Sequence, residues 1–535
     1  MKRNRFDYFK SCAFITLLCL SLFSCVHGPG ADVESINSLV SIGQAPGPQE
    51  SGNIPPAEKA GDRSDGPLSL TCQAAVRMVL ENNVSFRIER LEPVISRAEE
   101  GIQRAIFDPL VSISAGMGEI RDDTAPDVTG TGERVDSELL EADFKVRGSL
   151  PIGMDWEIGI AEDFRSNSGR EALESDSFDW NAVLTQSLLR GFGTRVNMVR
   201  LRQAELGTKI SIYELRGAAE ALVSQVEDSY WDCILAERSI EIYEKSLEIA
   251  NREVEEVKER IRVGKVAETE LAAAEAETAS RREQLIEARG NLAKRRLALI
   301  RLLDPSGWNA GWNRQIDLED KPEVPVVRLK SVEKHVETAL ECRADILQAR
   351  LQISRGDLEV TRTRNGLLPE LDFFAALGGS RYANSFSDGN DEDGDGVSYT
   401  VGLQFEWPLF NRDAGARYER ASLSMKQARA ALRNMEQLVQ VDVRSAYVDV
   451  ERAGERVKAT AATRELREKT LRNEQEKFRV GRSTTFLVSQ ATRDLTASRI
   501  AEVDAVIEYR KALLDLHRLD GSLLVRRGIT VEETR

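Results

Sequence analysis

AEALVSQVEDSYWDCILAERSIEIYEKSLEIANREVEEVKERI occupies residues 219–261 and leads into a glycine-containing turn, RVGKVAETE, at residues 262–270. The chain then continues without proline through residues 271–303, LAAAEAETASRREQLIEARGNLAKRRLALIRLL. Apolar side chains of the first segment recur at alternating steps of three and four residues, which is the heptad seam of a helix packed along its whole length. The seam consists of Tyr243, Leu247, Ala250, Val254, Val257 and Ile261. These residues predict a long antiparallel helical hairpin.

The same pattern occurs a second time. Its seam is Val443, Tyr447, Val450, Gly454, Val457 and Ala461, and its turn is FRVGRSTTF at residues 478–486. Tyr230 and Tyr447 lie 217 residues apart, and the Val-Gly pairs of the two turns have the same separation. An identical spacing from tyrosine to turn predicts two copies of one structural unit.

The length of the predicted helices limits the possible functions. About 68 residues without proline separate the helix-breaking segment Gly191-Phe192-Gly193 from Arg262, and residues 414–479 form a similar run. A helix rises about 1.5 Å per residue, so each run predicts a rod of about 100 Å. Rods of this length do not enclose a compact active site, and they are typical of coiled coils or of the staves of a tube.

Segments of alternating polarity precede both hairpins. They centre on Val111–Met117, Phe144–Leu150, Trp156–Ile160, Phe178–Leu184, Leu371–Leu377 and Val397–Trp407. Strands that are apolar on one face and polar on the other are typical of membrane β-barrels, although a soluble sandwich shows the same alternation. The grouping of these strands between long helices, with aromatic residues near the strand ends, favours the membrane barrel.

The number of barrel strands is a separate question. The two halves align at an offset of 260 residues before the strands and 221 after them, so the first half carries 39 additional residues in its strand region. Six alternating segments are present, and both four and six strands per chain are open. Twelve strands in a trimer would match twelve helical staves. We therefore expect four strands, with the hairpin that turns at Pro151 as an extension of the barrel or its loops.

Charge and metal-ligand content exclude two classes of function. The net charge is −15, which disfavours nucleic acid as a partner. His27, His335 and His517 are the only histidines and are far apart in the sequence, so they suggest no metal cluster and none is proposed. No nucleophile with a matching base is evident either, and we expect no enzyme and no cofactor.

The first residues predict export from the cytoplasm. A basic end is followed by the apolar run CAFITLLCLSLF and by Leu22-Phe23-Ser24-Cys25. The last four residues resemble a bacterial lipobox, in which Cys25 would become lipidated and the new first residue. An ordinary signal peptide with a chance cysteine is the alternative. Cys72, Cys233 and Cys342 would remain as an odd number of thiols in predicted helices, so no disulfide framework is expected.

Two motifs suggest chemistry that their context does not support. GFGTRV, from Gly191, has Val196 where a dinucleotide-binding loop needs its third glycine, and a strand-to-helix turn is the better interpretation. SDGNDEDGDG, residues 387–396, is rich in acids but places Gly389 and Tyr399 where a calcium loop requires carboxylates. We interpret it as a surface loop, with calcium binding left open.

The layout resembles the TolC-type outer-membrane efflux proteins over nearly the whole mature chain. The resemblance is carried by LTQSLLRGFG, FEWPLF and the two turns IRVGKVAETE and FRVGRSTTF. It implies an α+β membrane protein in which a homotrimer closes a transmembrane β-barrel in outer-membrane lipid, and long antiparallel helical hairpins form a periplasmic α-barrel. It also implies an adaptor protein at the hairpin tips and an inner-membrane pump of the RND or ABC type.

The resemblance also assigns residues to docking and gating. The docking tips would be Val263, Gly264, Lys265 and Val266 on the first hairpin and Val480, Gly481, Arg482 and Ser483 on the second. The periplasmic gate would involve Glu270, Phe478, Arg482, Leu487 and Gln490. We expect Gly264 and Gly481 to adopt positive φ at the ends of the long helices.

The sequence therefore predicts an outer-membrane exit channel of a tripartite efflux or type I secretion system, lipid-anchored, with a large periplasmic part. A periplasmic coiled-coil adaptor and a structural lipoprotein are the alternatives, and the exported substrate is not indicated. The predicted segments are a signal peptide (1–24), a lipid-anchored tether (25–66), a first structural repeat (67–304), an irregular connector (305–330), a second repeat (331–524) and a polar tail (525–535).

Overall fold

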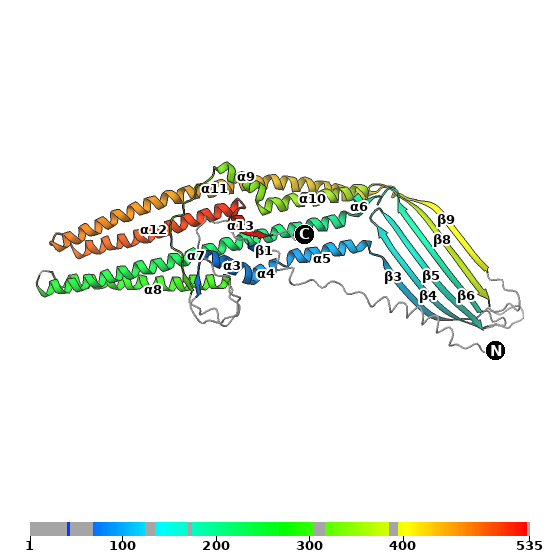
Figure 1. Cartoon of the computed structure of the whole chain (residues 1–535), viewed down its shortest axis with the longest axis horizontal. Helices are drawn as coiled ribbons and strands as arrows, with labels where there is room; N and C mark the ends of the chain where they lie inside the picture. Colours follow the sequence, from blue (N-terminus) through cyan, green and yellow to red (C-terminus); the bar gives the residue numbers. More distant parts are fainter. Residues whose placement is uncertain are drawn as a thin grey trace, which may run out of the picture.

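The chain folds into an elongated molecule with a β-sheet at one end and the tips of two helical hairpins at the other (Figure 1). This computed structural model describes residues 40–42, 68–123, 134–168, 174–264, 266–303, 316–384 and 394–531. Cys25, Lys265 and most of the acidic segment 387–396 lie outside these residues. The predicted combination of long helices and an antiparallel sheet is confirmed.

Both predicted hairpins are present. The first consists of α7 (Val199–Arg262) and α8 (Thr269–Leu303), with 64 and 35 residues, and the second of α11 (Arg412–Arg479) and α12 (Thr485–Leu519), with 68 and 35 residues. Every residue of the two predicted seams is buried or half-buried. The heptad pattern thus marks the side on which each long helix packs.

The segment before the sheet consists of short helices separated by breaks. It contains α3 (Cys72–Asn82), α4 (Val84–Glu89), α5 (Glu92–Arg104) and the 3₁₀ turn η2 (Ala105–Phe107). Asn83 causes the first break, because its extended backbone ends α3 while its side chain accepts the Phe86 N–H at 3.0 Å and caps α4. Pro93 then lies in the first turn of α5, where its missing N–H is tolerated.

Six strands form one antiparallel sheet in the order β3-β4-β5-β6-β8-β9. The hairpin that turns at Pro151 is part of this sheet, because β4 and β5 pair with each other and, along most of their length, with both neighbours. How many of the six strands enter the barrel of the assembled channel stays a prediction. The bounds are β3 Leu110–Asp123, β4 Arg134–Leu150, β5 Met154–Ser168, β6 Glu174–Ser187, β8 Glu370–Asn384 and β9 Gly394–Glu406.

The register gives the sheet one apolar and one polar face. Apolar side chains such as Ile113, Phe144, Ile158 and Leu377 share a face across the strands, and those of β9 are largely exposed in the single chain. Aromatic rings cover glycines on the neighbouring strand, and a Cβ at these glycines would lie too close to the ring. Atoms of the Trp180 ring lie 2.6–3.1 Å from the Cβ position of Gly379, and atoms of the Trp156 ring lie 3.0 Å from that of Gly148.

GFGTRV forms the turn from β6 into the helices, as predicted. Gly191 and Gly193 have φ values of 86° and 88°, which only glycine adopts without strain. The short α6 (Thr194–Asn197) follows, and Asn197 donates from Nδ2 to the Gly191 carbonyl at 2.7 Å. This geometry excludes a dinucleotide-binding loop, because the side chain of Asn197 occupies the turn.

Additional elements join the two halves at mid-length. They are α9 (Val332–Cys342), α10 (Ala344–Asn365), α13 (Leu523–Arg526) and the paired short strands β1 (Val40–Ile42) with β10 (Ile529–Val531) and β2 (Leu68–Leu70) with β7 (Ile316–Leu318). The main core lies here, around Tyr230, whose hydroxyl is 2.8 Å from Asp320 Oδ2.

β1 falls within the expected tether and β10 within the expected polar tail, where Ile529 is buried. Among the described helices, none is long and apolar enough to cross a membrane.

Candidate functional site at the hairpin tips

The first tip closes α7 with a valine-glycine pair. Val263 ends the helix and is 58 % exposed, and Gly264 has φ 73° with its N–H donating to the Ile261 carbonyl at 2.9 Å. Apart from Gly264 itself and its neighbours along the chain, no atom of the described residues lies within 4 Å of the position that a Gly264 Cβ would occupy. Glycine is therefore required by the left-handed backbone and not by crowding, and the predicted positive φ is confirmed. Val266 is half-buried beyond the turn.

The second tip has the same geometry. Val480 is 65 % exposed, Gly481 has φ 75°, and the Arg482 N–H donates to the Lys477 carbonyl at 2.8 Å, so the last carbonyls of α11 are satisfied. Ser483 donates from Oγ to Glu474 Oε2 at 2.8 Å and fixes the return of the chain. The two tips thus present matching apolar-glycine turns at the end of the molecule farthest from the sheet (Figure 1).

The predicted gate residues are not joined to one another in the single chain. Glu270 is half-buried in the first turn of α8, whereas Arg482, Leu487 and Gln490 are exposed. No ion pair links Glu270 to Arg482 in the part of the chain that the structure describes. Their gating role stays a prediction, and Phe478 contacts the other hairpin through Arg260.

That contact is made by Arg260, which the sequence did not single out. Its guanidinium carbon lies 4.1 Å from the centroid of the Phe478 ring, and Nη1 donates to the Phe478 carbonyl at 3.1 Å. Nη2 pairs with Glu256 at 2.6 Å, which orients the side chain along α7. Arg260 therefore joins the first hairpin to the second. The contact lies about one helical turn from the tips. The 217-residue offset aligns Arg260 with Lys477 and gives no reason to pair it with Phe478.

A buried polar cluster extends this contact between the hairpins. Glu253 Oε2 on α7 is 3.5 Å from Ser489 Oγ on α12, and Thr496 on α12 bonds Ser246 on α7 at 3.2 Å. Arg281 on α8 is only 3 % exposed and pairs with Glu277 at 2.5 Å. Polar groups that can exchange their partners for water separate at lower cost than an apolar seam, which makes this face suitable for reversible movement.

Glu253 predicts a pH dependence of stability. Burial raises the pKa of its carboxyl from 4.5 to about 7. The hydrogen bond from Ser489 and the positive charge of Arg281 lower this pKa but do not outweigh burial. The folded state holds this proton more tightly than the unfolded chain, so stability falls as pH rises from 4.5 to 7, by about 3 kcal/mol per chain. Glu253→Gln should therefore flatten the dependence of Tm on pH between pH 5 and pH 8. The exposed Glu259→Gln is the matched control, and an unchanged profile in Glu253→Gln would contradict the assignment.

The hairpins and the sheet are shared with a known protein family. The family model described as outer membrane efflux protein matches residues 156–304 and 335–522, more than half of the chain. The chain belongs to the outer membrane efflux protein family. Outer membrane efflux protein BepC of Brucella suis biovar 1 (strain 1330) is 24 % identical over 326 residues, covering 60 % of this chain and 67 % of BepC.

Solved structures show the same fold. The outer-membrane channel OprN has a TM-score of 0.62 at 17 % identity, with 84 % of this chain and 90 % of OprN covered. The Campylobacter jejuni CmeC outer membrane channel has a TM-score of 0.60 at 18 % identity, with 89 % and 94 % covered. Members of the family are channels and not enzymes. Among the described residues, no group of three or more His, Cys, Asp or Glu could hold a metal ion.

Proposed function

We propose that three copies of this chain form the exit channel of a tripartite efflux or type I secretion system. One observation carries the proposal: an apolar sheet face and two exposed tips lie at opposite ends of one molecule (Figure 1). The 64 residues of α7 between them span about 96 Å. In this arrangement the sheet lies in outer-membrane lipid, and the hairpins extend as an α-barrel through the periplasm.

The partners follow from the position of the tips. Val263 and Val480 are exposed apolar side chains on rigid turns, a suitable docking surface for the hairpin of a periplasmic adaptor. The adaptor would connect the channel to an inner-membrane pump of the RND or ABC type. Lys265 and Arg482 beside the glycines would add positive charge to this surface.

The two alternatives account for less of the molecule. A periplasmic adaptor needs one hairpin, whereas this chain has two, each preceded by strands of one shared sheet. A structural coiled-coil lipoprotein would have no use for an exposed apolar sheet face, which is unfavourable in water. Family membership supports the channel.

Assembly and location are tested together. The full chain, expressed with its signal, should fractionate with the outer membrane, require detergent for extraction, and have the mass of three chains in a mild detergent. A chain that stays monomeric, or that is soluble without detergent, would contradict the proposal.

The lipid anchor is a separate part of the proposal. Cys25, at the end of the apolar signal segment, would carry the lipid. Radioactive palmitate should label the wild-type chain, and Cys25→Ala should lose essentially all of the label because no other cysteine stands in a lipobox-like context. Cys72→Ala is the matched control and should be labelled normally. Undiminished labelling of Cys25→Ala would reject this anchor.

A further inference from the structure

The two edges of the sheet are complementary to each other. β3 and β9 are the terminal strands, with 14 and 13 residues, and each pairs with one neighbour among the described strands. The alternation of directions across six strands makes β3 and β9 antiparallel, so β9 of one copy can pair with β3 of the next. An unpaired backbone group in lipid costs several kcal/mol, so both edges require a partner strand there.

The β4–β5 hairpin is fixed at the helical end of the sheet. Its turn is hydrogen-bonded to the strand-to-helix junction, with the Gly193 N–H donating to the Ile152 carbonyl at 2.9 Å and the Ser187 N–H to the Gly153 carbonyl at 3.0 Å. Gly153 has φ 84°, and a Cβ there would lie 2.2 Å from the Gly191 carbonyl oxygen. The hairpin is thus built into the wall of the sheet and is not a loop that extends from it.

The widths of the two layers agree with six strands. Four helices meet the sheet as one layer, since α5 packs on α7, α7 on α10 and α10 on α11. At spacings of 8–10 Å they occupy roughly 32–40 Å. Six strands about 4.8 Å apart and tilted by about 40° occupy about 38 Å, whereas four would occupy about 25 Å. The number of helical staves predicts four strands per chain if each helix matches one strand. The width of the helical layer instead favours six strands.

We propose that all six strands of each chain enter the barrel wall, so that three copies close an 18-stranded barrel through β9–β3 pairing. The inference rests on the trimeric channel proposed above and adds its size. Barrel diameter grows about linearly with strand number, which gives a backbone diameter of about 36 Å for 18 strands and about 24 Å for twelve. The cross-section is then about twofold larger, enough for a water-filled pore that passes bulky hydrated solutes.

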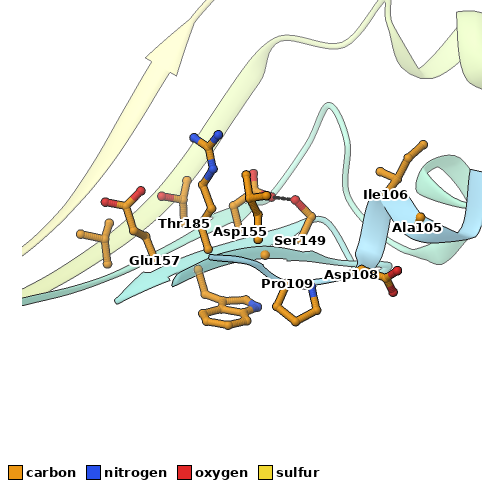
Figure 2. A pocket seen from close by; sticks show the side chains of 13 residues that line it. Ala105, Ile106, Asp108, Pro109, Ser149, Asp155, Glu157 and Thr185 are labelled. Carbon is orange, nitrogen blue, oxygen red and sulfur yellow. Dashed lines mark hydrogen bonds between the residues drawn. The ribbon is translucent and has the colours of Figure 1, made fainter. Parts of the chain in front are cut away.

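The polar face of the added hairpin fits an aqueous pore. Ser149, Asp155, Glu157 and Thr185 project from the same face of the sheet (Figure 2), beside a hollow of about 810 Å³ at the end of α5. Ser149 donates to Asp155 at 2.5 Å, and Arg147 lies directly across from Glu157. Charged side chains at this density are stable when they face water, and they would be unfavourable if the hairpin lay outside the wall in lipid.

Cysteine cross-linking in the purified trimer tests which strands are neighbours. Ser112→Cys on β3 should form disulfides between chains with one of the β9 variants Ser398→Cys, Thr400→Cys or Gln404→Cys. Ser112→Cys with Asn181→Cys on β6 is the matched control, because β4 and β5 separate these residues and no disulfide should form. A disulfide within one chain between positions 112 and 181 would mean that the hairpin has left the wall, which would overturn the proposal.

Electron cryo-microscopy of the same full-length trimer gives the second measurement. Eighteen strands in cross-section are expected, and twelve would overturn the proposal while leaving the trimeric channel intact. Deletion of residues 134–168 removes β4 and β5 and leaves β3 and β6 antiparallel, so it should reduce the barrel diameter by about one third. A chain that forms no trimer would contradict the proposed function itself. The mass of the protein in detergent distinguishes this outcome from a trimer with a twelve-stranded barrel.

Discussion

Replacing Gly264 and Gly481 together by valine is expected to reduce export at least tenfold while trimer abundance stays near normal. Both glycines have φ above 70° at the tips, and a β-branched residue there costs about 2 kcal/mol or refolds the turn. The arms pack elsewhere, through Val254, Val257 and Ala274 in the first hairpin, so the fold tolerates this loss. An adaptor that binds the shape of the turns does not.

Drug accumulation measured alongside trimer abundance separates docking from folding. Gly290→Val is the matched control, because Gly290 lies within α8 with nothing within 4 Å of its Cβ position. It should leave export unchanged. If the double variant exports normally, the tips have no part in the mechanism. If export falls only in proportion to protein level, the glycines merely end their helices.

Much of the helical part follows from the sequence alone. A heptad seam fixes the packed side of a helix, and a valine-glycine pair at its end fixes the turn, so both hairpins and the backbone of both tips could be predicted. The break at Asn83 could not be predicted as easily. It depends on one side chain that caps α4 and also donates to the Leu302 carbonyl at 3.0 Å, a contact with the far end of α8.

The sheet shows a different limit of sequence reasoning. Alternation identifies all six strands, but whether the Pro151 hairpin joins the sheet depends also on its anchors at Ser187, Gly193 and Asn197. The sequence indicates a strand-to-helix turn at Gly191 and Gly193 but not its contact with the hairpin. A helix-strand junction is a tertiary contact among segments about 40 residues apart, and periodicity carries no information about it.

The sequence predicts those parts of the candidate site that depend on neighbouring residues. It does not predict the contacts between the two hairpins. The positive φ of each tip glycine depends on its own helix end. The contact of Arg260 with Phe478 joins residues 218 positions apart and depends on how the two hairpins lie against each other. It could be found only once α7 and α11 were placed in space. Because this contact joins the two hairpins near the tips, its loss is expected to let the tips separate.

Arg260→Ala is expected to open the periplasmic end and to raise single-channel conductance several-fold. The substitution removes a cation–π contact and a charged hydrogen bond to the Phe478 carbonyl, together worth about 2 kcal/mol per chain. Three such ties in a trimer sum to about 6 kcal/mol, and about 5.5 kcal/mol suffices to shift an equilibrium from 1:99 to 99:1. Loss of the ties would therefore convert a mostly closed population into a mostly open one.

Two comparisons in planar bilayers make this result specific. Arg262→Ala removes the same kind of side chain two residues away, but Arg262 is exposed and pairs with Glu259 of its own helix, so conductance should not change. Phe478→Tyr keeps a ring beneath Arg260 and should stay closed, whereas Phe478→Leu should open in part, because the carbonyl hydrogen bond survives without the ring. Equal conductance in Arg260→Ala and wild type would show that this tie does not hold the gate, and would leave the polar cluster around Glu253 as the element to test.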